Sequence, residues 1–265
     1  MRTITQKLAT LFLAIGLIFI SCSDANDQEG EAPTIPSSES MSITFDGLST
    51  QNKVNSTVQQ SDTTIGIAYL SALAAGAILE VNFAVPKVLL SAAEGQEAEY
   101  LGDGEWQWTY SASGNQGSFS VRLTAQTGRE QVEWNFYVST TSSQVNWDDI
   151  LLFSGTSTYD GNDGTWNIYR PDTEQLISAS SWSIDETTTM ITLSVYEGTN
   201  ETTISRIDYM YSGTVKEISF SNLVEDTQTV IHWDVNTGVG SITSTNYNNG
   251  QQACWDENYQ DVACS

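Results

Sequence analysis

Apolar and polar residues alternate through most of the chain from residue 105 onward. In residues 105–111, EWQWTYS, Trp106, Trp108 and Tyr110 fall on one face of an extended segment, and polar residues fall on the other. A period of two residues is typical of a β-strand with one buried face and one face in water. The segment is therefore predicted to be a half-buried strand.

The same alternation recurs along the rest of the chain, in segments joined by short turns rich in Gly, Asn, Asp and Ser. About eleven strands are predicted, near residues 105–111, 119–125, 132–138, 150–153, 166–168, 177–184, 191–195, 207–211, 218–220, 231–235 and 242. Short links between consecutive strands predict an antiparallel meander. We expect it to form a curved or nearly closed barrel, because each strand has one polar face; a two-sheet sandwich is the alternative.

A helical entry segment is predicted at residues 62–95, ahead of the β region. Residues 65–79, IGIAYLSALAAGAIL, predict a buried helix, and Pro86 is suited to the first turn of a second short helix that ends at Gly95. A barrel of about eleven strands is too wide to be filled by its own side chains. One or two helices are therefore expected to pack against the sheet. Residues 41–45, MSITF, are expected to form a lone strand.

The first 21 residues have the pattern of a signal peptide. Arg2 and Lys7 precede an apolar run at residues 8–20, which ends in Phe19-Ile20-Ser21-Cys22. This tetrapeptide resembles the lipobox of bacterial envelope lipoproteins, although Phe replaces the usual Leu. The resemblance implies that the signal is residues 1–21 and that Cys22 carries lipid. The alternative is an ordinary secretory signal in which Cys22 has no special role.

The residues after Cys22 predict a tether and a location. Residues 22–40 are acidic and contain Pro33 and Pro36, so they are expected to be a flexible linker to a single domain at residues 41–265. Acidic residues after the lipidated cysteine resemble the export signal of surface lipoproteins in diderm bacteria. The resemblance implies an outer-membrane anchor in the cell envelope, on either the periplasmic or the cell-surface side.

Charge restricts the partners of this protein. The chain has 33 acidic and 9 basic residues, a formal net charge of −24. Such a surface repels phosphate backbones and anionic headgroups, which disfavours nucleic acid and a basic membrane patch. The predicted partners are the membrane, through Cys22, and a lipid or glycan ligand, and no cofactor is expected.

Cys254 and Cys264 are the cysteines that remain besides Cys22, and they lie close together at the C-terminus. In an oxidising envelope compartment this spacing predicts a disulfide that closes a short terminal loop. A metal or catalytic role would need partner residues that the neighbouring sequence does not contain.

Residues 160–166, DGNDGTW, suggest two alternatives. Asp160, Asn162 and Asp163 are oxygen ligands suited to calcium, yet Asn-Asp-Gly is also a strong signal for the turn of a hairpin. An EF-hand loop needs more ligands and a Glu at its twelfth position, where this chain has Pro171. A tight turn is therefore favoured over a calcium site.

Catalytic chemistry has little support in the sequence. The single histidine, His232, is predicted to lie on the wet face of its strand, and there is no Gly-x-Ser-x-Gly motif to accompany it and Asp234. A hydrolase that uses two carboxylates is not excluded by composition, but no pair stands out. We expect no catalytic residues and no enzyme activity.

Aromatic residues suggest a second kind of binding. Most of the eight tryptophans alternate with core residues. Trp147 lies in a polar linker and Trp255 lies inside the predicted disulfide loop, so these two are the candidates for exposed contacts with a glycan. Helices against an open meander are also similar to the LolA and LppX-like lipoprotein carriers, which implies a pocket for acyl chains. The first hypothesis is thus a noncatalytic lipoprotein that binds a hydrophobic or amphipathic ligand. The alternative is a surface glycan- or protein-binding module, and the third is a carboxylate-based hydrolase.

Overall fold

The computed structural model describes residues 30–48, 63–114, 117–142 and 146–264. Residues 31–265 form one compact unit. The compact unit is a single antiparallel sheet with one long helix, α1 (Thr64–Glu94), and the short 3-10 helices η1 (Ser38–Met41) and η3 (Asn248–Gly250) on the described part of the chain. The predicted antiparallel meander is confirmed.

On the described part of the chain the sheet has fourteen strands in the order of the sequence, and each strand pairs with its immediate neighbours in that order. They are β1 (Glu99–Gly102), β2 (Glu105–Gly114), β3 (Gly117–Thr127), β4 (Val132–Ser142), β5 (Asn146–Ser157), β6 (Asp163–Tyr169), β7 (Leu176–Ile184), β8 (Thr188–Glu197), β9 (Thr202–Ser212), β10 (Val215–Asn222), β11 (Thr227–Asp234), β12 (Gly240–Ser244), β13 (Ala253–Trp255) and β14 (Asp261–Val262). The eleven predicted segments fall in β2 to β12. The predicted number was too low, because β1, β13 and β14 have at most four residues and show too little alternation to be recognised.

The sheet is curved but open, so the prediction of a nearly closed barrel was wrong. Among the described residues β1 pairs with β2 and β14 pairs with β13, and the two end strands do not pair with each other. Both edges are short strands that carry acidic residues, Glu99 in β1 and Asp261 in β14. Short, charged edge strands discourage pairing with another sheet, which gives a physical reason why an open sheet is tolerated here.

One face of the sheet, here called the inner face, is filled by large aromatic residues alternating with small ones. The register places Ala125, Trp134, Gly155, Trp166 and Ser180 side by side in consecutive strands from β3 to β7. Trp134 and Trp166 are fully buried. Alternation of large and small side chains lets neighbouring rows interdigitate, and the inner face is therefore a packed core.

Glycine is required at position 155 for this packing. A Cβ at Gly155 would lie 2.0 Å from the carbonyl oxygen of Thr165 and 2.4 Å from the Trp166 ring. The indole thus covers the glycine of the neighbouring strand, an arrangement that supports otherwise weak Gly positions in sheets.

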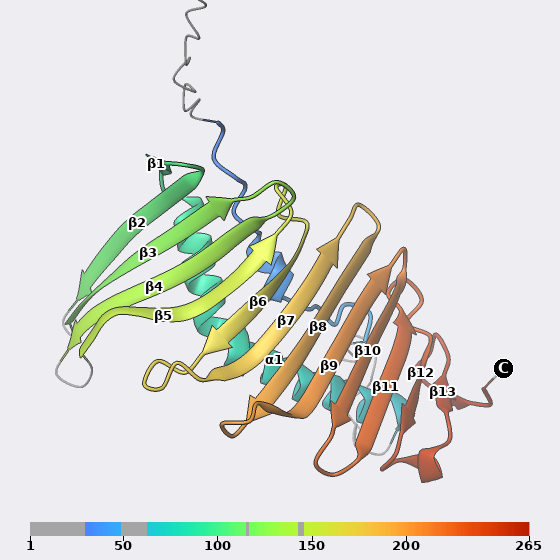
Figure 1. Cartoon of the computed structure of the whole chain (residues 1–265). Coiled ribbons are helices and arrows are strands. Elements are labelled where there is room, and N and C mark those ends of the chain that lie inside the picture. The colour runs from blue at the N-terminus through green and yellow to red at the C-terminus, as the bar shows by residue number, and fades with distance from the viewer. Residues whose placement is uncertain (1–29, 49–62, 115–116, 143–145, 265) are drawn as a thin grey trace, which may run out of the picture. The chain divides into compact units, whose positions relative to one another are not determined.

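Helix α1 crosses the inner face from one end of the sheet to the other (Figure 1). At its start, the Thr64 amide donates to Asp261 of β14 over 3.1 Å, and at its end the Tyr110 hydroxyl of β2 donates to the Leu89 carbonyl over 2.6 Å. Burial raises the pKa of Tyr110 to about 12. A helix of 31 residues is about 46 Å long, which is long enough to span most of the strands.

Residues 62–95 were predicted to contain two helices, but α1 continues through Pro86. Proline cannot donate to the carbonyl four residues earlier and costs about 3 kcal/mol inside a helix. Pro86 itself is buried, and so are Phe83 before it and Leu90 after it. Burial of both halves on the same sheet compensates for the local penalty.

Residues 31–48, here called the strap, run beside α1 on the inner face. The indole N–H of Trp166 donates to the Ser40 hydroxyl over 3.2 Å, and that of Trp233 donates to the Asp46 carbonyl over 2.8 Å. The strap is therefore part of the packed unit. Two expectations were wrong. Residues 31–40 pack against the rest of the unit and are not a free linker. Residues 41–45 are not a strand, because Met41 ends η1 and residues 42–45 pack beside α1 without joining the sheet.

Candidate functional site

The outer side of α1, which faces away from the sheet, exposes a stripe of apolar residues. Val81 is 83% exposed and Val88 is 68% exposed, and Leu70, Leu73 and Val85 lie along the same side. The opposite side of the helix is buried at intervals of three and four residues. α1 is thus apolar on both sides, whereas a surface helix normally has a polar outer side.

By length and composition α1 is apolar enough to cross a membrane, with 39% of its most apolar 18-residue window buried. A core helix of a soluble protein meets the same criterion. In this fold α1 is attached to the sheet along its length, so its exposed residues form the outside of a folded layer.

A groove of about 370 Å³ lies between α1 and the strap. Met41, Ile43 and Phe45 form the strap side, and Leu73 and Leu79 contribute from α1. Gly76 allows the close approach of these two walls, since a Cβ there would lie 2.8 Å from the Phe45 ring. The groove is therefore apolar along its walls and open to the exposed stripe at Leu73.

The polar end of this groove contains an ion pair. The ammonium of Lys87 lies 2.7 Å from a carboxylate oxygen of Glu80, and both residues line the groove. The pair is partly exposed to solvent, so it contributes little to stability. It does place a cation and an anion beside the apolar walls of the groove.

A second groove, of about 510 Å³, lies where the strap meets the end of α1. It is lined by strap residues 32–35, by Glu94 and Gln96, and by Trp108 at its base. The Thr34 amide donates to the Tyr159 carbonyl over 3.3 Å and holds the strap there. The strap thus forms one wall of both grooves.

Lys216 fastens the middle of the strap. Its side chain is 5% exposed, and its ammonium donates to the Thr44 hydroxyl and carbonyl over 2.5 and 3.2 Å and to Asp46 over 3.1 Å. The hydrogen bond from Lys216, followed by that from Thr44, holds the pKa of Asp46 below its ordinary value. Lys216 was not predicted to be buried. The available signal was its position in β10, two residues before the core residue Ile218, which places both side chains on the inner face.

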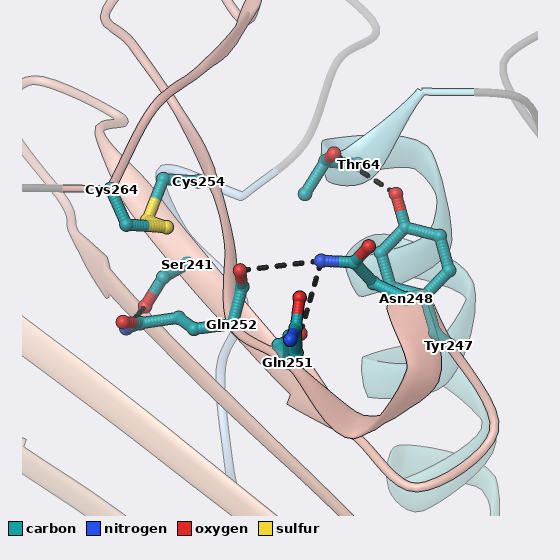
Figure 2. The surroundings of a disulfide bond; sticks show 8 residues. All are labelled: Thr64, Ser241, Tyr247, Asn248, Gln251, Gln252, Cys254 and Cys264. Atoms are coloured by element: carbon teal, nitrogen blue, oxygen red, sulfur yellow. Dashed lines mark hydrogen bonds between the residues drawn. A yellow bond between two sulfur atoms is a disulfide. The ribbon is translucent and has the colours of Figure 1, made fainter.

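The predicted disulfide between Cys254 and Cys264 is confirmed, with the two Cα atoms 5.3 Å apart. Figure 2 shows it beside the hairpin that faces the start of α1, where the hydroxyls of Thr64 and Tyr247 lie 3.1 Å apart. The cross-link and this contact both fix the C-terminal strands.

Cys22, the predicted lipidation site, lies outside the described residues, as do the signal peptide and the tether up to residue 29.

Residues 160–163 form the predicted turn, between β5 and β6. One carboxylate oxygen of Asp160 accepts from the Thr158 hydroxyl over 2.7 Å, and the other accepts from the Asn162 side chain over 2.9 Å. These bonds, that from Thr158 first, lower the pKa of Asp160. Among the described residues no three His, Cys, Asp or Glu side chains converge as a metal site. The Asp160 oxygens thus serve the turn.

The two tryptophans proposed as exposed contacts are not freely exposed. Trp255 is fully buried and its indole donates to the Gly238 carbonyl over 2.6 Å, so its predicted exposure was wrong. Trp147 belongs to β5 and is partly buried against the core. Polar neighbours in sequence were a poor guide because both residues occupy strand positions that face inward.

His232 lies exposed on the outer face of β11, as predicted. The adjacent acid, Asp234, accepts from the Thr214 hydroxyl over 2.6 Å and from the Thr237 amide over 2.8 Å. These bonds, with that from Thr214 first, lower the pKa of Asp234 to about 2. Asp234 therefore stabilises a turn, and its hydrogen bonds direct it away from a catalytic role with His232.

No protein-family model matches the chain, and no curated protein or solved structure matches it at a significant level.

Proposed function

We propose that the protein is a noncatalytic lipoprotein, anchored to the outer membrane through lipid on Cys22, that binds the apolar part of an amphipathic ligand along α1. The observation that carries this proposal is the exposed apolar stripe of α1 beside an apolar groove. Contiguous exposed apolar surface on a soluble protein is typical of an interaction site. The ligand would be a molecule with an acyl chain and a polar head.

The groove between α1 and the strap suits such a ligand in size and chemistry. Its volume of about 370 Å³ lies in the range of small-molecule sites, roughly 300–1,000 Å³. The acyl chain would contact Phe45 and Leu73, and the head would lie near the Lys87 and Glu80 pair. The packed tryptophans on the inner face leave α1, and not the centre of the sheet, as the surface for binding.

The test compares two exposed leucines, one in the groove and one away from α1. Leu73 lines the groove and is 42% exposed, whereas Leu223, in the turn after β10, is 52% exposed and lies outside the lining. The purified chain with Cys22→Ser, which has no attached lipid, is titrated with N-phenyl-1-naphthylamine, a fluorescent apolar probe, and the probe is displaced with palmitate. Full burial of an exposed leucine contributes about 1.5–3 kcal/mol. Leu73 is already more than half buried, so loss of its contact with the ligand corresponds to roughly a 3- to 8-fold change in affinity, and an aspartate buried against the ligand adds a desolvation cost.

We expect Leu73→Asp to weaken palmitate binding at least tenfold and Leu223→Asp to leave it within about twofold. Equal effects of the two substitutions would show that the groove is not the site, and absence of displaceable binding would refute the ligand proposal.

The lipid anchor is tested by fractionating bacteria that express the chain with Cys22 or with Cys22→Ser. The Cys22→Ser protein should leave the membrane fraction, and its retention there would contradict lipidation at Cys22.

A further inference from the structure

The outer face of the sheet has a polar hollow over β2 to β5, on the opposite side from α1. The register places Thr109, Arg122 and Tyr137 in one row across β2, β3 and β4, and Ser111, Ser120 and Ser139 in the next. With Asp149 of β5 they line a cavity of about 440 Å³, here called the β2–β5 pocket. This volume is within the usual range for small ligands.

Arg122 and Asp149 form one wall of the β2–β5 pocket. The guanidinium donates to both carboxylate oxygens of Asp149, over 3.1 and 2.5 Å, and lies 4.0 Å above the Tyr137 ring. The contact extends from β3 over β4 to β5. A bidentate arginine–carboxylate pair has fixed geometry, so its remaining donors and acceptors are held in defined positions.

The backbone of β5 is distorted where it supplies Asp149. Ser139 of β4 lies opposite both Asp148 and Asp149, because the register shifts between Val138 and Thr140. Asp149 has φ of 51°, which is unfavourable for a residue other than glycine, and its amide donates to the Ser139 hydroxyl over 2.8 Å. Bulges often redirect side chains next to functional sites, and strained residues are concentrated at such sites. Here the distortion brings Asp149 within reach of Arg122.

The other wall offers unused hydrogen-bonding groups. The hydroxyls of Thr109, Ser111 and Ser120 are exposed and form no hydrogen bond with the described residues. Each hydroxyl can donate once and accept twice. The β2–β5 pocket thus has hydroxyls on one side and a rigid donor and acceptor pair on the other.

We propose that the β2–β5 pocket binds a neutral saccharide. Adjacent hydroxyls of a sugar both donate and accept hydrogen bonds, which matches the mixed donors and acceptors of the two walls. Arg122 is already neutralised by Asp149, and the chain carries a net charge of −24, so an anionic ligand would be repelled. The site is independent of the groove at α1, since the two lie on opposite faces of the sheet.

The test uses the purified chain and a panel of neutral oligosaccharides, namely maltoheptaose, cellohexaose, laminarihexaose and xylohexaose, with an oligogalacturonate as the anionic comparison. Binding is measured by isothermal titration calorimetry. Arg122→Met removes one wall of the β2–β5 pocket. Arg206→Met is the matched control, because Arg206 forms a bidentate pair with Asp208, 2.7 Å away, outside the pocket lining.

We expect at least one neutral oligosaccharide to bind, Arg122→Met to weaken that binding at least tenfold, and Arg206→Met to leave it unchanged. Ser120→Phe fills the β2–β5 pocket while leaving the ion pair of Arg122 and Asp149 intact, and it should also abolish binding. It provides an independent test of the pocket if Arg122→Met folds poorly. Binding that survives Ser120→Phe, binding of the oligogalacturonate alone, or no binding of any neutral member at millimolar concentration would overturn the proposal. Leu73→Asp should leave saccharide binding unchanged, which separates this site from the groove.

Discussion

Lys216 allows a quantitative test of how the strap is held. Its ammonium has three oxygen partners within 3.2 Å, two on Thr44 and one on Asp46. A hydrogen bond to a charged group contributes about 1.5–3 kcal/mol when its partners are buried. Asp46 is 78% exposed, however, and an ion pair with an exposed partner is worth only about 0.2–1 kcal/mol.

The two partners should therefore differ when they are removed separately. Lys216→Met keeps the apolar stem, removes all three hydrogen bonds and also removes the cost of burying the ammonium. Because these effects partly cancel, we expect a net loss of about 1–3 kcal/mol in the free energy of unfolding. Asp46→Asn leaves both Thr44 contacts intact and should cost less than about 1 kcal/mol.

Unfolding in urea is monitored by tryptophan fluorescence, and hydrogen exchange is measured for the amides of residues 42–48. Lys216→Met should accelerate exchange in these residues, while residues 31–37, which have separate contacts with the sheet, should change little. An equal or greater loss of stability for Asp46→Asn would refute the assignment of Thr44 as the main partner. Unchanged exchange in Lys216→Met would refute the role of Lys216 in holding the strap.

The remaining predictions concern the sheet and its turns. Gly155→Ala should lower the free energy of unfolding by about 2 kcal/mol or more in the same urea assay, because the new Cβ would overlap the Thr165 carbonyl. In the control Gly95→Ala the nearest new contact is 3.8 Å away, so the free energy of unfolding should change by less than about 0.5 kcal/mol. Similar losses of stability in the two variants would contradict the packing argument. Asp234 has a lowered pKa of about 2, so its contribution to stability is present above its unfolded pKa and is lost as the pH falls from about 4 to 2. Asp234→Asn should therefore destabilise the fold at pH 7 and progressively less toward pH 2. A constant difference across that range would refute the linkage.

The strands were predictable where burial alone determines the pattern. Trp106 and Trp108 alternate with polar residues because one side of β2 faces the core and the other faces water. The short edge strands were missed because two to four residues do not establish a period. Closure of the sheet was also not predictable, because alternation is the same in an open sheet and in a barrel.

The strap and the outer-face site depend on contacts between distant residues. Pro86 and residues 41–45 were misread because tertiary burial overrode their local preferences. Arg122 and Asp149 are 27 residues apart, and their pairing depends on an irregular register in β5. A regular alternation cannot reveal a bulge, so the sequence offered no sign that these two side chains meet.

The exposed side of α1 is the feature that folding explains least. The buried side already attaches the helix to the sheet, through residues such as Phe83 and Leu90, which have essentially no exposure. Val81 and Val88 bury little surface and so contribute little to stability, since the hydrophobic contribution scales with the apolar area removed from water. Polar residues at these positions would preserve the fold and improve solubility, as on most surface helices. The apolar outer side therefore supports the proposed binding, in which an apolar chain would be removed from water in the groove at Leu73.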